Sequence, residues 1–140
     1  MTRKESKEIK YFKGIKYVLA EDVWFETPLL GFEGQTRFVR LYKDGWLHIK
    51  AGWGWDGASG PTIDTKTSLR GSLAHDGGAL CMRQEFIPRA MWDLNDRMLE
   101  RINLEDGMCS FRAKLWTRML AKIKGAYGHP DKKRRVYTAP

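Results

Sequence analysis

Cysteine and histidine are scarce in this sequence, which has two cysteines, Cys81 and Cys109, and three histidines in 140 residues. Two cysteines are too few for a disulfide scaffold or a zinc cage, so both thiols are expected to be reduced. The motifs C-x-x-C, H-x-x-x-H and G-x-S-x-G do not occur. A conventional zinc site and a Ser-His-Asp hydrolase are therefore not expected.

Long apolar segments are also missing. The sequence has no run of about eighteen apolar residues, the length that predicts a transmembrane helix, and its N-terminus lacks the apolar core of a secretory signal. We therefore expect a soluble protein with no membrane span, located in the cytoplasm. The length suits one domain, and the 42% hydrophobic content predicts a folded globule.

The charge is positive and unevenly placed. Lysine and arginine number 25 against 17 acidic residues, which gives a formal net charge of +8. Basic residues gather at both ends, so we divide the chain into a flexible basic N-terminus (1–10), a single α+β domain (11–128) and a basic C-terminal tail (129–140). This balance suits nucleic acid, an anionic membrane surface or an acidic protein, although a solvated surface is the simpler explanation. The candidate contacts are Lys122, Lys124, Lys132, Lys133, Arg134 and Arg135.

The first half of the chain has the pattern of an antiparallel sheet. Residues 16–27 mix β-branched and aromatic side chains and predict a strand interrupted at Glu21 and Asp22. Two further strand-like segments flank Asp44-Gly45, which is a strong hairpin signal.

The second half changes to helical periodicity. Segments 68–84, 88–102 and 110–128 predict three helices, the first of them capped by Thr67 or Ser68. Strands followed by helices predict an α+β fold, with a small N-terminal antiparallel β-sheet followed by about three α-helices. The residues predicted to face inward are Leu69, Leu73, Gly77 and Leu80 in the first helix, Met91, Leu94, Met98, Leu99 and Ile102 in the second, and Phe111, Leu115, Met119 and Ile123 in the third.

A glycine-rich loop, AGWGWDGASGP, spans residues 51–61. Its glycines allow a close approach to a ligand, but the spacing matches neither the P-loop nor the dinucleotide-binding fingerprint. Asp56 is a candidate to bind a cation or cap a turn, and Ser59 is a weaker ligand or a capping hydroxyl. The alternative is a long connection in which one indole fills the core.

The pair His75-Asp76 lies on the first predicted helix. On a helical wheel, Asp76 falls at the edge of the inward face and His75 falls further around. A carboxylate in that position needs a partner, and a cation, a loop amide or an arginine such as Arg89 would serve. The adjacent Gly77-Gly78 predicts that something packs closely against this helix. The GWGWDG loop is the expected neighbour, which would bring Asp56 and Ser59 to Asp76.

The second predicted helix carries Asn95 within its apolar stripe, whereas Asp93 and Asp96 fall on the outer side of the wheel. A buried amide should be hydrogen-bonded, so Asn95 is expected to meet Asp76 or His75 across the helix pair. The two aspartates are expected to be solvated or paired with nearby arginines.

The order of these features resembles a family of phage and prophage proteins known as domain of unknown function 1353. The resemblance covers about residues 47–102, with WDGASGP and AHD as its most specific parts. It implies a bacteriophage or prophage origin and brings no established activity. Gly60 stands in place of the usual aliphatic residue, the usual tyrosine after His-Asp is missing, and the helical acidic position falls on Asn95 or, one residue off, on Asp96. The positions that match the family's marked residues are Asp56, Gly57, Ala58, Ser59, Pro61, His75 and Asp76.

The same features, in the same order, have a fainter resemblance to secreted phospholipases A2. In those enzymes a glycine-rich loop binds calcium and a helical His-Asp supplies the base and a ligand. This chain lacks the dense disulfides of that family.

Three functions follow as hypotheses. The first is a bacteriophage-encoded interaction protein, located in the virion or the host cytoplasm, whose basic ends and exposed tryptophans contact phage structural proteins or a host protein. The second is a small hydrolase in which His75 is the base and Asp56 and Asp76 bind a Ca²⁺ or Mg²⁺ ion, the one cofactor considered. The third is a basic nucleic-acid-binding protein. The first is favoured because the sequence shows no complete catalytic constellation.

Overall fold

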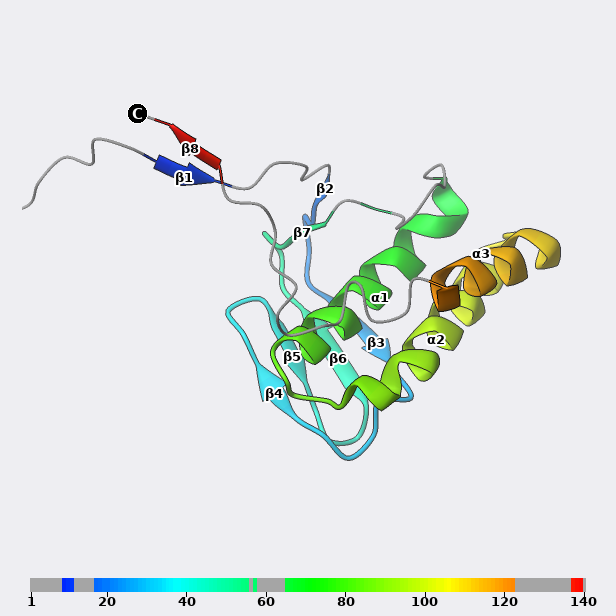
Figure 1. Ribbon diagram of the computed structural model, residues 1–140, viewed down its shortest axis with the longest axis horizontal. Helices are drawn as coiled ribbons and strands as arrows, with labels where there is room; N and C mark the ends of the chain where they lie inside the picture. Colours follow the sequence, from blue (N-terminus) through cyan, green and yellow to red (C-terminus); the bar gives the residue numbers. More distant parts are fainter. Residues whose placement is uncertain (1–8, 12–16, 56, 58–64, 123–136, 140) are drawn as a thin grey trace, which may run out of the picture.

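The computed structural model describes residues 9–11, 17–55, 57, 65–122 and 137–139 (Figure 1). Antiparallel β-sheets within residues 17–55 are followed by three helices, so the predicted α+β fold is confirmed. The strands are β1 (Ile9–Tyr11), β2 (Tyr17–Val18), β3 (Val23–Glu26), β4 (Gly34–Gln35), β5 (Val39–Leu41), β6 (Trp46–Ile49), β7 (Gly54–Trp55) and β8 (Tyr137–Ala139). The helices are α1 (Lys66–Arg83), the short 3-10 helix η1 (Arg89–Met91), α2 (Trp92–Glu105) and α3 (Ser110–Lys122).

The main sheet has four antiparallel strands in the order β3-β6-β5-β4. Its central hairpin joins β5 to β6 through Asp44-Gly45, as predicted, with Gly45 at a φ of +90° that favours glycine. The predicted interruption at Glu21 and Asp22 is also confirmed, because β2 ends at Val18 and β3 begins at Val23. Two smaller ladders accompany the main sheet, in which β2 pairs with β7 and β1 pairs with β8.

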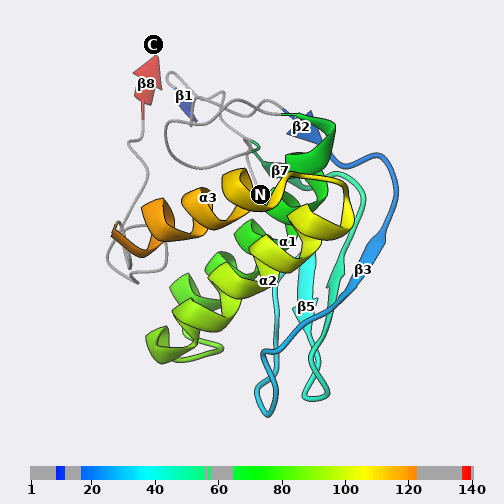
Figure 2. The same cartoon turned by 90° about the vertical axis from the view of Figure 1, so that its right-hand side faces the viewer.

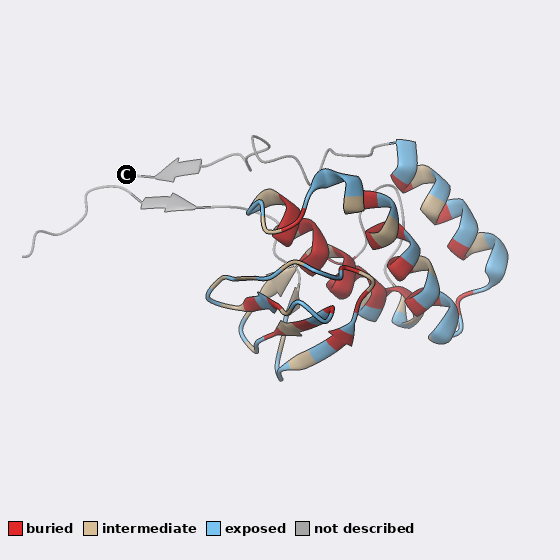
Figure 3. Cartoon of the chain, turned by 90° about the horizontal axis from the view of Figure 1, so that it is seen from below, coloured by how far each residue is buried: buried red, intermediate tan, exposed pale blue. Residues whose placement is uncertain are grey.

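The sheet has one face toward the helices and one face away from them. Strand residues alternate between the faces, so that Phe25, Leu41 and Leu47 are buried while Trp24 and Trp46 are exposed. Figure 2 shows the three helices on the same side of the sheet, and Figure 3 shows the buried residues gathered where the helices face the sheet and one another. Each large apolar side chain buried there contributes about 1.5–3 kcal/mol.

Helix α1 lies between the main sheet and α2. A Cβ atom at Gly77 would lie 3.0 Å from side-chain carbons of both Leu47 and Ile49 on β6, and one at Gly78 would overlap the side chain of Asn95 on α2. The prediction that the GWGWDG loop packs against Gly77-Gly78 is therefore wrong. The two glycines allow α1 to approach β6 on one side and α2 on the other.

The boundaries and faces of α1 also differ from the prediction. The N-cap is Thr65, whose backbone N–H donates to the Ser68 hydroxyl over 2.9 Å, so neither Thr67 nor Ser68 is the N-cap. Leu69 and Leu80 are only half-buried. The reason is that α1 is covered on two sides, so a single inward stripe does not describe its contacts. The buried residues of α1 are Ser68, Gly71, Ser72, Leu73, Ala74, His75, Gly77, Gly78, Ala79, Cys81 and Met82.

The third helix packs through a different stripe from the one predicted. Ala113, Trp116 and Leu120 are buried, whereas Phe111 is 78% exposed and Leu115 is 44% exposed. The inward face assigned to α3 is therefore wrong. The two stripes are centred about 110° apart around the helix, and Trp116 belongs to the buried one. The predicted Met119 is half-buried, and Ile123 lies outside the described residues.

Three other predictions concern the whole chain. The described helices include none with the length and apolar character needed to cross a membrane. Neither cysteine is in a disulfide, with Cys81 buried and Cys109 exposed. Strand β1 (9–11) pairs with strand β8 (137–139). Residues 9 and 10 belong to the segment expected to be a flexible N-terminus, and β8 belongs to the segment expected to be a C-terminal tail. The domain boundaries themselves stay a prediction.

Candidate functional site

The side chains of His75 on α1 and Asp96 on α2 form a buried ion pair. Their Nε2 and Oδ1 atoms are 2.8 Å apart, and their side chains are 2% and 4% exposed. The Trp92 indole stands edge-on to the imidazole, with ring centroids 5.8 Å apart. The predictions that placed Asp96 on the outer side of α2 and His75 beyond the edge of the inward face of α1 are therefore wrong.

Asn95 makes a second polar contact between the same two helices. Its Nδ2 donates a hydrogen bond of 3.0 Å to the backbone carbonyl of His75, and its side chain is fully buried. This confirms the expectation that Asn95 is buried and reaches His75. Asp76, by contrast, is 27% exposed, and its Oδ1 lies 4.0 Å from His75 Nδ1.

The two carboxylates determine the charge of His75. Burial of the ring lowers its pKa, but hydrogen bonding and charge from Asp76 and Asp96 outweigh burial and raise the pKa from 6.5 to about 9. The ring is then a cation at pH 7, with both nitrogens donating. That state suits an ion pair that joins α1 to α2, and it does not suit a general base, which must accept a proton.

Several buried polar atoms near the pair have no hydrogen-bond partner within the described part of the chain. They include Asp96 Oδ2, Asn95 Oδ1 and Trp92 Nε1. Leaving such atoms unpaired costs free energy, so this centre is stabilised by its charges and packing rather than by complete hydrogen bonding.

The glycine-rich loop begins against α1. Trp55 on β7 packs on Tyr17 with ring centroids 5.3 Å apart, and its indole N–H donates to the Ser72 hydroxyl over 3.2 Å. Ser72 lies one turn before Asp76. Gly57 is buried at a φ of +83°. Asp56 and Ser59 lie outside the described residues, so their approach to Asp76 stays a prediction.

A divalent-cation site is not complete within the residues that the structure places. Across 9–11, 17–55, 57, 65–122 and 137–139, no group of three or more histidine, cysteine, aspartate or glutamate side chains is arranged to hold a metal ion. The proposed ligand Asp56 is not among those residues. Binding of Ca²⁺ or Mg²⁺ by Asp56 and Asp76 therefore stays a prediction.

The face of the main sheet that points away from the helices carries an aromatic cluster, which we define as Trp24, Tyr42, Trp46 and His48. The Trp24 and His48 rings are stacked with centroids 4.0 Å apart, and the Trp24 ring lies 5.8 Å from Tyr42 and 6.5 Å from Trp46. Trp24 is 51% exposed and Trp46 is 40% exposed. The Arg40 guanidinium lies over the Tyr42 ring at 4.4 Å.

The strand register explains the stacking in the aromatic cluster. Trp24 and His48 are partners across the β3–β6 ladder. Because Thr27 N–H donates to Gly45 O, the hydrogen-bonded pairs of this ladder fall on odd-numbered residues of β3, and Trp24 belongs to a non-hydrogen-bonded pair. Side chains of such pairs are closer together. Asp22 orients the imidazole further, with its Oδ2 atom 2.9 Å from His48 Nε2.

Helix α3 presents a second candidate surface. Lys114, Arg118 and Lys122 are exposed, and no acidic residue occurs between Ser110 and Lys122. Of the six basic contact residues predicted from the sequence, only Lys122 lies among the described residues, and it is exposed as a contact residue must be.

Comparisons of the chain with protein-family models, with curated proteins and with solved structures found no match.

Proposed function

We propose that this chain is a small interaction protein encoded by a bacteriophage, and that it binds a phage structural protein or a host protein through its aromatic cluster. The observation that carries the proposal is the aromatic cluster on the helix-free face of the sheet, in which Trp24 stacks on His48 and both Trp24 and Trp46 are exposed. The protein would then act in the virion or in the host cytoplasm.

The physical properties of the aromatic cluster are those of a protein-binding surface. Aromatic residues and arginine are enriched at the centres of interfaces, where they often contribute most of the binding energy. The rings of the cluster are held by one another and by Asp22 through His48, so little side-chain entropy remains to be lost on binding. A partner that covers these rings would remove two exposed indoles from water.

The phage origin rests on the resemblance of residues 47–102 to the family known as domain of unknown function 1353. That resemblance also suggests the two settings for the partner, which are the assembled virion and the infected cell. Mass spectrometry of purified virions separates them, because a host-directed effector would be absent from the particle.

Photo-cross-linking tests the proposed contact surface. With benzoylphenylalanine in place of Trp46, irradiation of cells that carry the complete phage is expected to give one discrete adduct. The same substitution at Phe111, an exposed aromatic residue on α3, serves as the matched control and should not give that adduct. With the partner identified, Trp46→Ala should weaken its binding by about tenfold or more. Equal labelling from both positions, or binding unaffected by Trp46→Ala, would count against the proposal.

Nucleic-acid binding is a second candidate, favoured by the charge of α3. Its exposed side chains include Lys114, Arg118 and Lys122 with no acidic residue in the helix. A row of basic side chains binds phosphates without regard to sequence, and the affinity falls as salt rises.

A gel-shift series in increasing salt tests this second candidate. The triple variant Lys114→Glu, Arg118→Glu and Lys122→Glu should weaken binding of single- or double-stranded DNA by about a hundredfold at low salt and flatten the salt dependence. The control changes the same number of charges on the sheet side, at Arg37, Lys43 and Lys50. If the control triple weakens binding equally, total charge rather than α3 is responsible.

The hydrolase alternative has less support. His75 is buried and charged, and it lines neither of the two cavities described in the next subsection. The proposed role of His75 as a base therefore rests on the resemblances alone.

A further inference from the structure

The outer edge of β3 has no partner among the strands that the structure describes. Strand β3 is the first strand of the main sheet, it pairs with β6 on one side, and none of the other described strands pairs with its second side. An edge strand presents backbone donors and acceptors that another extended chain can use. Figure 2 shows β3 along the right-hand margin of the sheet.

The backbone groups that face outward on β3 follow from its ladder. Thr27 N–H donates to Gly45 O, so alternate residues Phe25 and Val23 also direct their backbone groups toward β6. Trp24 and Glu26 therefore direct theirs away from the sheet. The Glu26 carbonyl already accepts from Arg101 Nη2 over 3.1 Å. The outward groups that remain are the N–H and C=O of Trp24 and the N–H of Glu26.

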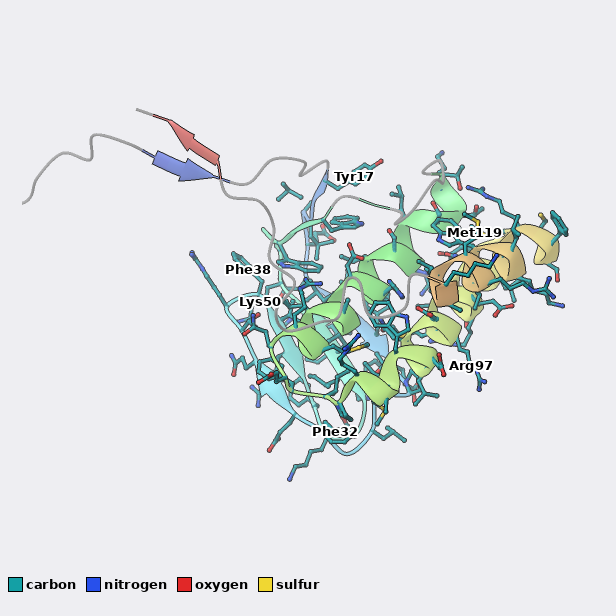
Figure 4. The ribbon with its side chains drawn as sticks, viewed as in Figure 1. Tyr17, Phe32, Phe38, Lys50, Arg97 and Met119 are labelled. Atoms are coloured by element: carbon teal, nitrogen blue, oxygen red, sulfur yellow. The ribbon has the colours of Figure 1, made fainter. Side chains whose placement is uncertain are left out.

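Two cavities lie one after the other along this edge. The first has a volume of about 380 Å³ and is lined by Tyr17, Trp24, Phe25, Trp55 and Leu73, with side chains that are largely apolar and aromatic. It lies between β3, the β2–β7 ladder and α1. Figure 4 labels Tyr17, which lines this first cavity, and Arg97, which lines the second.

The second cavity lies between the end of β3 and α2. Its volume is about 500 Å³, and its lining includes Pro28, Leu94, Met98, Arg97 and Arg101. The Arg101 guanidinium is bound to Glu105 and to the Glu26 carbonyl. Arg97 is exposed and has no ion-pair or hydrogen-bond partner among the described residues. Glu26 and Thr27 complete the lining. The cavity therefore offers apolar side chains from Pro28, Leu94 and Met98 and, at Arg97, one uncommitted positive charge.

We propose that an extended segment of a partner protein adds to the free edge of β3 as a further β-strand, with a large apolar side chain in the first cavity and an acidic side chain at Arg97 in the second. The proposal rests on the proposed function and specifies how the partner is recognised. The main-chain hydrogen bonds to Trp24 and Glu26 supply affinity, and the two cavities supply specificity.

The placement of the cavities fixes the spacing in the bound segment. Both are lined by helices as well as by β3, so the two side chains must point to the same side of the added strand. Side chains on one side of a strand recur every second residue, at about 6.6 Å. Residues 23–25 line the first cavity and residues 26–28, at and beyond the end of β3, line the second. The two centres are therefore about three residues apart along the chain, which gives a spacing of two or four residues in the partner. A nucleic acid lacks the alternating backbone donors and acceptors that this edge would pair with.

A display library of random octapeptides, selected on the complete chain, tests the proposal. The enriched peptides should carry an aromatic or large aliphatic residue and an acidic residue two or four positions apart. Fluorescein-labelled peptides should then bind Glu26→Pro about tenfold more weakly than the unchanged chain, because proline removes the outward N–H without removing a donor from the β3–β6 ladder. The matched control Glu26→Thr keeps that N–H and should bind within about threefold.

A second measurement covers the case in which Glu26→Pro does not fold. Addition of an enriched peptide to the unchanged chain should slow amide hydrogen exchange at Trp24 and Glu26, which face outward, and leave Phe25 unaffected. The proposal is overturned if no peptide is enriched, or if peptide binding leaves hydrogen exchange at both amides unchanged. It is also overturned if the peptides bind Glu26→Pro and Glu26→Thr equally, or if this edge pairs with a second copy of the chain. Trp46→Ala does not change the edge of β3. Partner binding by that variant therefore tests the role of the aromatic cluster independently of strand addition.

Discussion

Replacing Asp96 with alanine is expected to lower the free energy of unfolding by about 3–5 kcal/mol at pH 7. The substitution leaves His75, which is 2% exposed and charged in the unchanged chain, without the carboxylate that lies 2.8 Å from its Nε2 atom. The variant must either bury an uncompensated cation or fold with a neutral ring. Urea unfolding followed by tryptophan fluorescence measures the change, and Trp92 reports on the site because it contacts the His75 ring.

The loss of unfolding free energy caused by Asp96→Ala should become smaller as the pH rises. The pKa of His75 is raised from 6.5 to about 9 in the folded chain, so the stabilisation is fully present below pH 6.5 and is lost as the pH rises through 9. The difference in unfolding free energy between the unchanged chain and Asp96→Ala should therefore be largest near pH 6 and narrow above pH 9. If the difference in unfolding free energy between the two proteins instead increases from pH 6 to pH 9, His75 is not the charged partner of Asp96.

Asp93→Ala is the control for Asp96→Ala, because Asp93 is an exposed carboxylate in the first turn of the same helix. Removing a surface carboxylate is expected to change the unfolding free energy by less than about 1 kcal/mol. If the two variants lose equal stability, the buried pair does not hold α1 and α2 together as inferred.

Gly78→Ala is expected to destabilise the fold by about 2–4 kcal/mol, although alanine is intrinsically better than glycine in a helix by about 1 kcal/mol. The new methyl group would overlap the Asn95 side chain, which is fully buried and is held by its hydrogen bond to the His75 carbonyl. Either Asn95 loses that bond or α2 moves away from α1. Denaturant unfolding measures the loss.

Two further variants show whether the loss comes from this contact. Gly77 is adjacent in sequence, and the nearest atoms to a methyl group there would be the terminal methyl carbons of Leu47 and Ile49 at 3.0 Å. A small shift of these flexible ends and the helix preference for alanine should keep Gly77→Ala within about 1 kcal/mol of the unchanged chain. The double variant Gly78→Ala with Asn95→Ala should be less destabilised than the sum of its parts, because the smaller side chain makes room for the methyl group. If the losses of stability in the two single variants simply add in the double variant, the contact between residues 78 and 95 is not the cause of the destabilisation.

Local signals in the sequence were sufficient for the central hairpin and for the three α-helices. Asp44-Gly45 predicted the central hairpin because few residue pairs adopt the turn between two strands, and the structure has Gly45 at a positive φ there. The change from alternation to helical periodicity after residue 67 predicted three helices, as observed. The burial of Asn95 was also predictable, because an amide within an apolar stripe shares the environment of its neighbours.

The faces of the helices could not be predicted in the same way. A helical wheel assumes one buried side, but α1 is covered by β6 and by α2, and this placed His75 on the wrong side. In α3, the choice between two apolar stripes depends on which side meets α2, and nothing local to the helix decides it. The ion pair of His75 with Asp96 joins residues 21 positions apart, so it depends on how the two helices dock.

The aromatic cluster was missed for a related reason. Trp24, Trp46 and His48 occur in predicted strands, but only the pairing register brings them onto one face and into contact. The alternation of Phe25, Leu47 and Ile49 with these residues was a usable signal, because it separates one side of each strand from the other. Half of the glycine-rich loop, including Asp56 and Ser59, lies outside the described residues, so its relation to Asp76 stays a prediction.

The double-sided burial of α1 has a consequence for how the molecule folds. Its three glycines, Gly71, Gly77 and Gly78, lower its intrinsic helix stability by about 3 kcal/mol relative to alanine. Such a helix is not stable until both of its neighbours are in place, and neither the sheet nor the pair of α2 and α3 can bury its apolar face without it. The sheet and the helices are therefore a single cooperative unit, in which loss of α1 from one side removes the support for the other.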